Sequence, residues 1–309
     1  MIAVDAMGGD NAPEQIVLGS LLASRLGISI KLFGCKETII SILDKNDFKW
    51  KKYDISILDA DQIIGMAEEP VNAVRKKINS SIVKAIQSVK QKKCKAVVSA
   101  GNTGAFMAAA SLILGKKPEI NRVPIIGVLP IKDKKKVLCL DIGANVDCKP
   151  EYLVQFAYLA KEHARNVLNL DNPRIALLSN GHEEGKGNML VKKAYELLKK
   201  SDLNFVGNIE PYSIFNYYAD IIVSDGFSGN IFLKTIEACA QNFITQNYEI
   251  GKDGALLLGV KGIVVAVHGN ANAQAIKNAI ILARNTVVYE ENFYGVCEKS
   301  IDRTITKDI

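Results

Sequence analysis

The chain has 309 residues, a formal net charge of +6, 48% hydrophobic residues and 23% charged residues. This composition is typical of a folded globular protein and excludes an intrinsically disordered chain. The positive charge is too small to indicate nucleic-acid binding by itself. No apolar run reaches the roughly 18 residues that a membrane helix needs, and Ile2-Ala3-Val4 begins a strand rather than a signal peptide. We therefore expect a soluble cytoplasmic protein.

The cysteines are scattered along the chain, without a Cys-x-x-Cys pair or a histidine at metal-binding spacing. They are Cys35, Cys94, Cys139, Cys148, Cys239 and Cys297. This pattern indicates reduced thiols and predicts neither a disulfide framework nor a zinc site.

Short β-branched apolar runs alternate with longer helical patterns. The expected strands are 2–4, 28–33, 55–58, 96–99, 125–129, 137–140, 175–178, 221–223 and 263–267. The expected helices are 13–26, 36–44, 80–92, 104–114, 151–168, 188–200, 230–246 and 271–288. Continuous apolar strands separated by helices indicate an α/β fold with a mainly parallel sheet buried on both faces. We expect one domain, residues 1–309, in which a boundary between two lobes near 120 or 150 is poorly marked.

Six of the expected strands run into glycine, asparagine and aspartate. These loops are 5–11, 100–104, 141–145, 179–188, 224–230 and 268–270. Ligands of an open parallel sheet bind outside the carboxyl ends of its strands, so we expect all six loops to face one cleft. Glycine permits close approach of the backbone, and helix N-termini favour anions. Single loops of this kind are ordinary turns, whereas six of them predict a site for a phosphate-sized anion.

These motifs together resemble the bacterial fatty acyl phosphate acyltransferase family, the acyl-carrier-protein:phosphate transacylases of phospholipid synthesis. The matching segments are D-A-M-G-G-D at 5–10, V-S-A-G-N-T-G-A at 98–105, L-D-I-G-A-N at 140–145, E-E-G-K-G-N at 183–188, S-D-G-F-S-G-N at 224–230 and H-G at 268–269. They span nearly the whole chain in the order typical of the family.

The resemblance implies an α/β/α sandwich similar to isopropylmalate dehydrogenases and phosphate acetyltransferases. It implies transfer of an acyl group from acyl-carrier protein to inorganic phosphate, with no cofactor. The acyl phosphate would then serve a membrane-bound glycerol-3-phosphate acyltransferase. It also implies a homodimer and a cytoplasmic location, in which the enzyme sits peripherally at the inner face of the membrane.

The sequence departs from the family pattern in several places. Asn11 stands where histidine is usual, Ile78-Asn79 replaces Lys-Asp, and Tyr212-Ser213 replaces Arg-Asp. The stretch between Asn230 and Gly254 is shorter than usual. The family carries there a helical hairpin with an apolar tip linked to membrane docking, so docking by that device is not expected.

Three residues are the expected catalytic groups: Lys186, Asn230 and Asn102. Lys186 in its glycine-flanked loop would hold phosphate or an oxyanion, and the two asparagines would donate hydrogen bonds. The alternatives are a solvated lysine for Lys186, a helix N-cap for Asn230 and a turn-forming residue for Asn102. The expected phosphate- and substrate-binding residues are Gly8, Gly9, Gly101, Thr103, Gly104, Asn145, Gly187 and Gly229.

Three aspartates, Asp5, Asp141 and Asp225, directly follow strands. A carboxylate next to phosphate is repulsive, so we expect them to orient Lys186 and the asparagines or to brace backbone N–H groups. A magnesium site is the less favoured alternative, and we expect no metal.

No acidic residue lies between Glu69 and Glu119, an interval that contains ten lysines and arginines. A charge run is usually a solvated face. Arg75, Lys76 and Lys77, just before the helix expected at 80–92, are the preferred docking site for an acidic carrier protein. No nucleic-acid recognition motif accompanies the charge.

Two apolar segments allow two interpretations each. Residues 255–260 form either a buried turn or strand or a surface for a membrane or acyl chain. On helix 230–246, the stripe of Ile231, Phe232, Ile236 and Phe243 is either core or a homodimer contact.

Two other functions remain open at this stage. One is a phosphate- or nucleotide-dependent enzyme on the same fold, such as a decarboxylating dehydrogenase, although no Gly-x-Gly-x-x-Gly fingerprint is present. The other is a non-catalytic adaptor for carrier protein or membrane, which would not need the polar loop residues.

Overall fold

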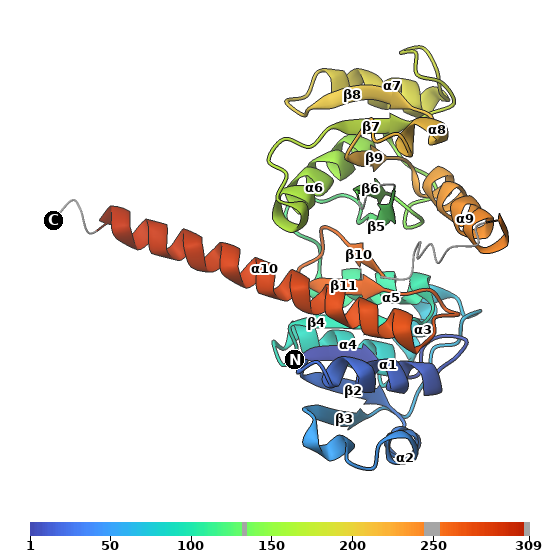
Figure 1. Ribbon diagram of the computed structural model, residues 1–309, viewed down its shortest axis with the longest axis vertical. Helices are drawn as coiled ribbons and strands as arrows, with labels where there is room; N and C mark the ends of the chain where they lie inside the picture. Colours follow the sequence, from blue (N-terminus) through green and yellow to red (C-terminus); the bar gives the residue numbers. More distant parts are fainter. Residues whose placement is uncertain (132–134, 244–253, 306–309) are drawn as a thin grey trace.

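The computed structural model describes residues 1–131, 135–243 and 254–305. Within them, eleven strands form one sheet in the order β3-β2-β1-β4-β11-β10-β5-β6-β9-β7-β8 (Figure 1). The strands are β1 Ile2–Asp5, β2 Ile30–Gly34, β3 Ile55–Asp59, β4 Ala96–Ser99, β5 Ile125–Pro130, β6 Lys136–Leu140, β7 Ile175–Leu178, β8 Phe205–Ile209, β9 Ile221–Val223, β10 Ala255–Leu257 and β11 Ile263–Ala266.

Helices cover both faces of this sheet. They are α1 Glu14–Ser24, α2 Lys36–Asn46, α3 Pro70–Lys76, α4 Ser81–Lys90, α5 Thr103–Ala109, α6 Pro150–Leu168, α7 Met189–Lys199, α8 Pro211–Ile214, α9 Gly226–Phe243 and α10 Ala273–Ile305. The predicted strands and helices are all present. The sequence analysis missed the short elements β8, α3 and α8. It also placed the start of α9 four residues too late.

Alternate side chains of each central strand enter two separate hydrophobic clusters. In β4, Val98 packs into the cluster shared with α1, α6, α7 and α10, whereas Val97 packs into the cluster shared with α4, α5 and α9. Because neighbouring residues of a strand point to opposite faces, helices must cover both. The structure thus confirms the expected α/β/α arrangement.

The direction of the strands reverses within the sheet. β1, β2, β3, β4 and β11 are mutually parallel, and β6, β7, β8 and β9 are mutually parallel. β5 pairs with β6 antiparallel, and β10 is antiparallel to both β11 and β5. β5 therefore runs with the first set, and the second set runs the opposite way.

Two expectations about apolar segments can now be decided. Leu256 and Leu257 of β10 are buried, so 255–260 contains a buried strand rather than an exposed membrane surface. On α9, Phe232 and Ile236 pack against the core, whereas Ile231 is 53% exposed. The side chain of Phe243 lies outside the described part, as do residues 244–253 of the shortened stretch. None of the helices described is both long and apolar enough to cross a membrane.

His163 of α6 is buried and lines a small cavity between α6, the β10–β11 turn and α10. Burial lowers the pKa of His163 from 6.5 to about 4, because the charged imidazolium would lose its hydration. The stability that comes from holding the imidazole neutral is fully present above pH 6.5. It is lost as the pH falls toward 4.

We predict that acidification from pH 7 to pH 5 costs about 2 kcal/mol of folding free energy through His163 alone. His163→Gln cannot titrate, so the difference between its free energy of unfolding and that of the wild type should shrink by this amount at pH 5. Denaturant unfolding of both proteins at pH 7 and 5 measures the effect. Parallel pH dependences would contradict it.

Candidate functional site

The loops after β1, β4 and β11 pack together as a first loop group, residues 5–11, 100–104 and 268–271. Asp10 N donates to the carbonyl of Gly269 at 2.7 Å, and Asn11 Nδ2 donates to the carbonyl of Asn270 at 2.9 Å. Gly8 approaches Gly101 so closely that a Cβ on Gly8 would lie 2.7 Å from the Cα of Gly101. These loops therefore need glycine for backbone-to-backbone contact.

Asp5 lies beneath the first loop group and is 1% exposed. Ser99 Oγ donates to its carboxylate at 2.7 Å, and Gly101 N in turn donates to Ser99 Oγ at 3.0 Å. Burial raises the pKa of Asp5, while the hydrogen bonds from Ser81 and Ser99 oppose the shift. Asp5 thus braces the loops, as one of its two expected roles required.

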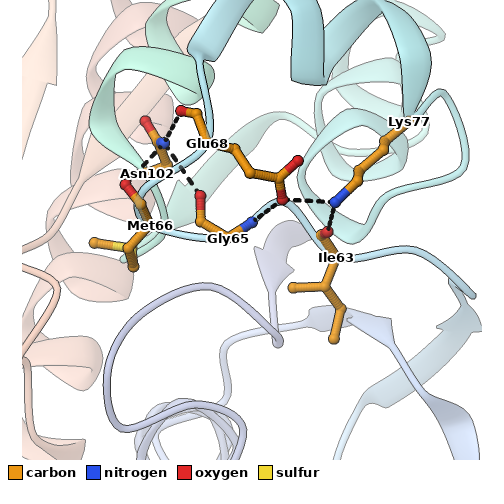
Figure 2. A network of polar contacts seen from close by, with 6 residues as sticks. All are labelled: Ile63, Gly65, Met66, Glu68, Lys77 and Asn102. Atoms are coloured by element: carbon orange, nitrogen blue, oxygen red, sulfur yellow. Dashed lines mark hydrogen bonds and ion pairs between the residues drawn. The ribbon is translucent and has the colours of Figure 1, made fainter.

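Asn102 of the first loop group uses its whole side chain in hydrogen bonds to the 65–68 turn and to α5. Its Nδ2 donates to the carbonyls of Gly65, Met66 and Glu68 at 3.0–3.2 Å, and its Oδ1 accepts from Ala105 N as the N-cap of α5 (Figure 2). These bonds leave no amide proton for a substrate in this conformation. The structure therefore shows Asn102 holding the 65–68 turn, which is close to the alternative of a turn-forming residue.

One of the expected docking cations, Lys77, is bound at the 65–68 turn. Lys77 Nζ donates to Glu68 Oε1 at 2.6 Å and to the carbonyl of Ile63 at 2.8 Å (Figure 2). The Lys77 ammonium holds the pKa of Glu68 below its ordinary value. Arg75 and Lys76 are exposed. Of the three cations, Lys77 is thus the one committed to an internal ion pair.

A second loop group, residues 141–147, 179–188 and 224–230, follows β6, β7 and β9. Its centre is Asp141, which is completely buried and accepts five hydrogen bonds. The donors are the backbone N–H groups of Ile125, Gly143, Ala144 and Asn145 and the amide Nδ2 of Asn145, at 2.7–3.2 Å. Burial raises the pKa of Asp141, and these donors oppose the shift by stabilising the charged form.

Asn145 and Asn230 both lie in the second loop group. Asn145 Nδ2 donates to the Val123 carbonyl at 3.0 Å as well as to Asp141, so both of its protons are used. Asn230 Nδ2 donates to the carbonyl of Ile142 at 3.0 Å, which is its only hydrogen bond to the described residues and leaves its second proton available. Asn145 is therefore a brace, whereas Asn230 retains a free donor.

The N-cap of α9 is Asp225, not Asn230. Asp225 Oδ1 accepts from Ser228 N at 2.8 Å, and the helix begins at Gly226. Gly229 lies against Asp141, since a Cβ at Gly229 would fall on the Asp141 carbonyl oxygen. The first turn of α9 is thus fixed on the Asp141 loop. The alternative reading of Asn230 as a helix N-cap was wrong because the helix starts earlier.

Lys186 lies in the loop between β7 and α7. Its aliphatic stem covers Gly181, and its ammonium has no ion pair or hydrogen bond with any residue that the structure describes. The neighbouring Glu184 is paired with Lys199 at 2.9 Å, and Gly187 N donates to Asn180 Oδ1 at 2.9 Å. Lys186 is therefore an exposed cation on an ordered loop.

The structure contradicts the expectation that all six loops share one edge of the sheet. Because β5 and β6 are antiparallel, the two sets of strands run in opposite directions. The carboxyl ends of β1, β4 and β11 therefore lie beside the amino ends of the set that contains β6, β7 and β9. A strand of four residues is about 13 Å long, so the two loop groups are separated by about one strand length. Asn102 belongs to the first loop group, and Asn145, Lys186 and Asn230 belong to the second.

Helix α9 connects the two loop groups. His268 Nε2 of the first group lies 3.5 Å from Glu237 Oε2, which is two turns along α9 from Asn230. Two turns of helix span about 10 Å. A ligand of that length can touch both groups.

The remaining predicted glycines and Thr103 lie in these same loops. Gly9 and Gly187 adopt φ values of +113° and +94°. Gly104 serves packing, because a Cβ there would lie 2.6 Å from Pro70 Cγ of α3. Thr103 is exposed at the start of α5.

Sequence reasoning missed several residues of both groups. Ser99 is the last residue of β4 and Ser224 directly follows β9. They hydrogen-bond to Asp5 and to the Asp141 carbonyl, respectively. His182 Nε2 lies 3.0 Å from Ser213 Oγ and 3.3 Å from Glu210 Oε2, which ties the Lys186 loop to α8. The position of a polar residue at the carboxyl end of a strand was the available signal for the two serines. No sequence signal connects His182 with Ser213.

Within the described residues no group of metal ligands is found, and the Cys148 thiol near Asp141 is not suited to act as a nucleophile. No three side chains of histidine, cysteine, aspartate or glutamate gather there as metal ligands. Burial, aided by the Asp141 charge, raises the pKa of the nearby Cys148 thiol to about 12, so this thiol stays protonated.

Known proteins resemble this chain over most or all of its length. Residues 1–249 match the model of a family described as "Fatty acid synthesis protein". A "Phosphate acyltransferase" of Clostridium botulinum (strain Loch Maree / Type A3) is 42% identical over 339 aligned positions, covering 100% of both chains. This aligned length exceeds the 309 residues of the chain, so the relative contains positions absent here.

Solved structures share the fold. A phosphotransacetylase from Streptococcus pyogenes superposes with a TM-score of 0.69 at 20% identity, covering 94% of each chain. A branched-chain phosphotransacylase from Enterococcus faecalis V583 superposes with a TM-score of 0.62 at 17% identity, covering 93% of this chain and 100% of the other.

We predict that Asp141→Asn lowers the free energy of unfolding by about 3 kcal/mol, because the new amide cannot accept all five hydrogen bonds. Denaturant titration measures the loss. The matched control is Asp171→Asn, whose carboxylate is 88% exposed and which should change stability by less than about 0.5 kcal/mol. Equal effects of the two substitutions would refute the bracing role of Asp141.

Proposed function

The chain belongs to the fatty acid synthesis protein family whose curated relatives are phosphate acyltransferases, it is an acyltransferase, and we propose that it transfers a fatty acyl group from acyl-carrier protein to inorganic phosphate. The product would be an acyl phosphate for phosphatidic acid synthesis. We place phosphate in the second loop group.

The single observation that carries this placement is that two loops after the neighbouring strands β7 and β9 each carry an unused donor. The Lys186 ammonium has no partner among the described residues, and Asn230 has one unused amide proton. A cation and a neutral donor on ordered loops suit an oxyanion. Asn102 and Asn145 contribute by holding loops, and Asp5, Asp141 and Asp225 by bracing N–H groups.

The reaction needs little acid or base help from the protein. Inorganic phosphate is largely a dianion near neutral pH, and one of its oxygens would form the new bond to the acyl carbon. The carbon–sulfur bond breaks, and the sulfur leaves as a thiolate whose conjugate acid has a pKa of about 8.5. Water then protonates the thiolate. Positioning of the two reactants supplies on the order of 7–11 kcal/mol, and one oxyanion donor supplies about 3–4 kcal/mol.

Carrier-protein docking is assigned to the surface around α3. Arg75 and Lys76 are exposed there, and Ile78 is exposed beside them at 60%. A mixture of cations and apolar side chains suits an acidic partner that also buries apolar surface. Lys77, which the sequence analysis included, is left out because Glu68 holds it.

The wider setting follows the family resemblance. We propose a homodimer, since the C-terminal part of α10 extends away from the body (Figure 1) and a second copy would give it a packing partner. We further propose one functional domain over 1–309. The enzyme would act in the cytoplasm or at the inner membrane face, and would supply a membrane glycerol-3-phosphate acyltransferase. Family membership favours this reading over a dehydrogenase or a non-catalytic adaptor.

We predict that wild-type protein mixed with acyl-carrier protein thioester and phosphate forms acyl phosphate and releases thiol. Lys186→Ala should lower kcat/KM for phosphate about 100-fold, because one charged oxyanion donor is lost. Trapping acyl phosphate as hydroxamate measures the rate. Lys193→Ala, an exposed lysine of α7, is the control and should retain activity. Full turnover by Lys186→Ala would remove Lys186 from the site.

Reversing the charge of both docking cations, Arg75→Glu with Lys76→Glu, should raise KM for acyl-carrier protein about tenfold at low salt. Turnover of acyl-coenzyme A, which has no carrier protein, should change little. Lys36→Glu on α2 is the matched control. A similar loss with both donors would place the defect in the fold or the site rather than in docking.

A further inference from the structure

The described side chains of helix α9 pack on the body through one side of the helix. Phe232, Leu233 and Ile236 contact the buried cluster on their face of the sheet. The opposite side, which we name the α9 outer face, carries Phe227, Ile231, Thr235 and Ala238. These residues recur every three or four positions, so they share one side of the helix. All four are exposed.

The two largest side chains of the α9 outer face lie next to the reaction site. Phe227 is 60% exposed and Ile231 is 53% exposed, and Ile231 directly follows Asn230. Large apolar side chains exposed together mark an interaction surface.

A third exposed apolar side chain comes from the adjoining loop. Val146 is 59% exposed. The residue before it, Asn145, accepts a hydrogen bond at 2.8 Å from Gly226, the residue before Phe227. Val146 and Phe227 are therefore held on adjoining segments by the Asp141 loop, and the apolar surface is continuous with the second loop group.

A second copy of the chain is a poor occupant of this surface. Lys234 lines the same shallow groove as Ile231 and Ala238. A two-fold symmetric helix contact would bring the groove against its own copy, so two Lys234 ammonium groups would approach each other. A flexible hydrocarbon chain meets no such repulsion and can cover both the phenyl ring and the lysine stem.

We propose that the α9 outer face, from Phe227 toward Ala238, binds the fatty acyl chain of the thioester substrate. This proposal rests on the proposed acyl transfer. The thioester carbonyl would lie at Asn230, and the chain would run along the helix away from the phosphate. Along α9, the 12 residues from Phe227 to Ala238 span about 18 Å, which accommodates a long acyl chain.

The test compares palmitoyl and acetyl thioesters of carrier protein as donors. Phe227→Ser and Ile231→Ser should each lower the ratio of kcat/KM for palmitoyl over acetyl donor about tenfold, since each removes apolar contact with the long chain only. Phe48→Ser is the control, because Phe48 is 76% exposed beyond α2 in the other half of the sheet. Circular dichroism confirms that each variant folds.

Unchanged ratios in both variants would overturn the proposal. Conversion of a wild-type dimer to monomer by Ile231→Ser, measured by sedimentation, would also overturn it and assign the surface to a second copy. If the wild type forms acyl phosphate from neither donor, the proposed function itself fails, and this result is distinct from an unchanged ratio.

Discussion

The buried carboxylate of Asp141 is the interaction on which the candidate site depends. It sits at the end of β6, where it gathers the N–H groups of the 143–145 turn and of Ile125 at the start of β5. The same turn fixes α9, since Ile142 accepts from Asn230 and Asn145 accepts from Gly226. The Asp141 carboxylate, which accepts hydrogen bonds and has no counterion among these partners, thus sets the position of Asn230, the residue that we assign to the oxyanion.

The reversal of strand direction at β5 and β6 gives the molecule two loop groups instead of one. The first is joined to the 65–68 turn, because Asn102 donates to the Glu68 carbonyl and Lys77 holds the Glu68 carboxylate (Figure 2). The second keeps unused donors on Lys186 and Asn230. Helix α9 runs from the second loop group to the first, where Glu237 contacts His268. This arrangement suits a reaction with two substrates: phosphate at one group, and a carrier protein delivered from the side of α3.

Much of this architecture was predictable from sequence, and the failures have physical causes. Continuous apolar runs such as Ala96–Ser99 identified strands buried on both faces. The direction of β6 was predictable, because residues 130–136, which separate the expected strands 125–129 and 137–140, are too few for the crossover that a parallel neighbour needs. This spacing was not used in the prediction of the sheet. The motif loops correctly indicated where polar groups gather. They did not reveal that the side-chain amides of Asn102 and Asn145 donate to backbone carbonyls, since the partners Gly65 and Val123 are remote in sequence. The cap of α9 was misplaced because both Asp225 and Asn230 are good N-cap residues.

The most direct test of the central claim is to locate phosphate by diffraction from crystals grown with phosphate and a non-reactive thioether analogue of the acyl donor. We predict phosphate within hydrogen-bond distance of Lys186 Nζ and Asn230 Nδ2, with the Asp141 turn unchanged. Phosphate bound instead among Gly8, Gly101 and His268 in the first loop group would contradict the claim.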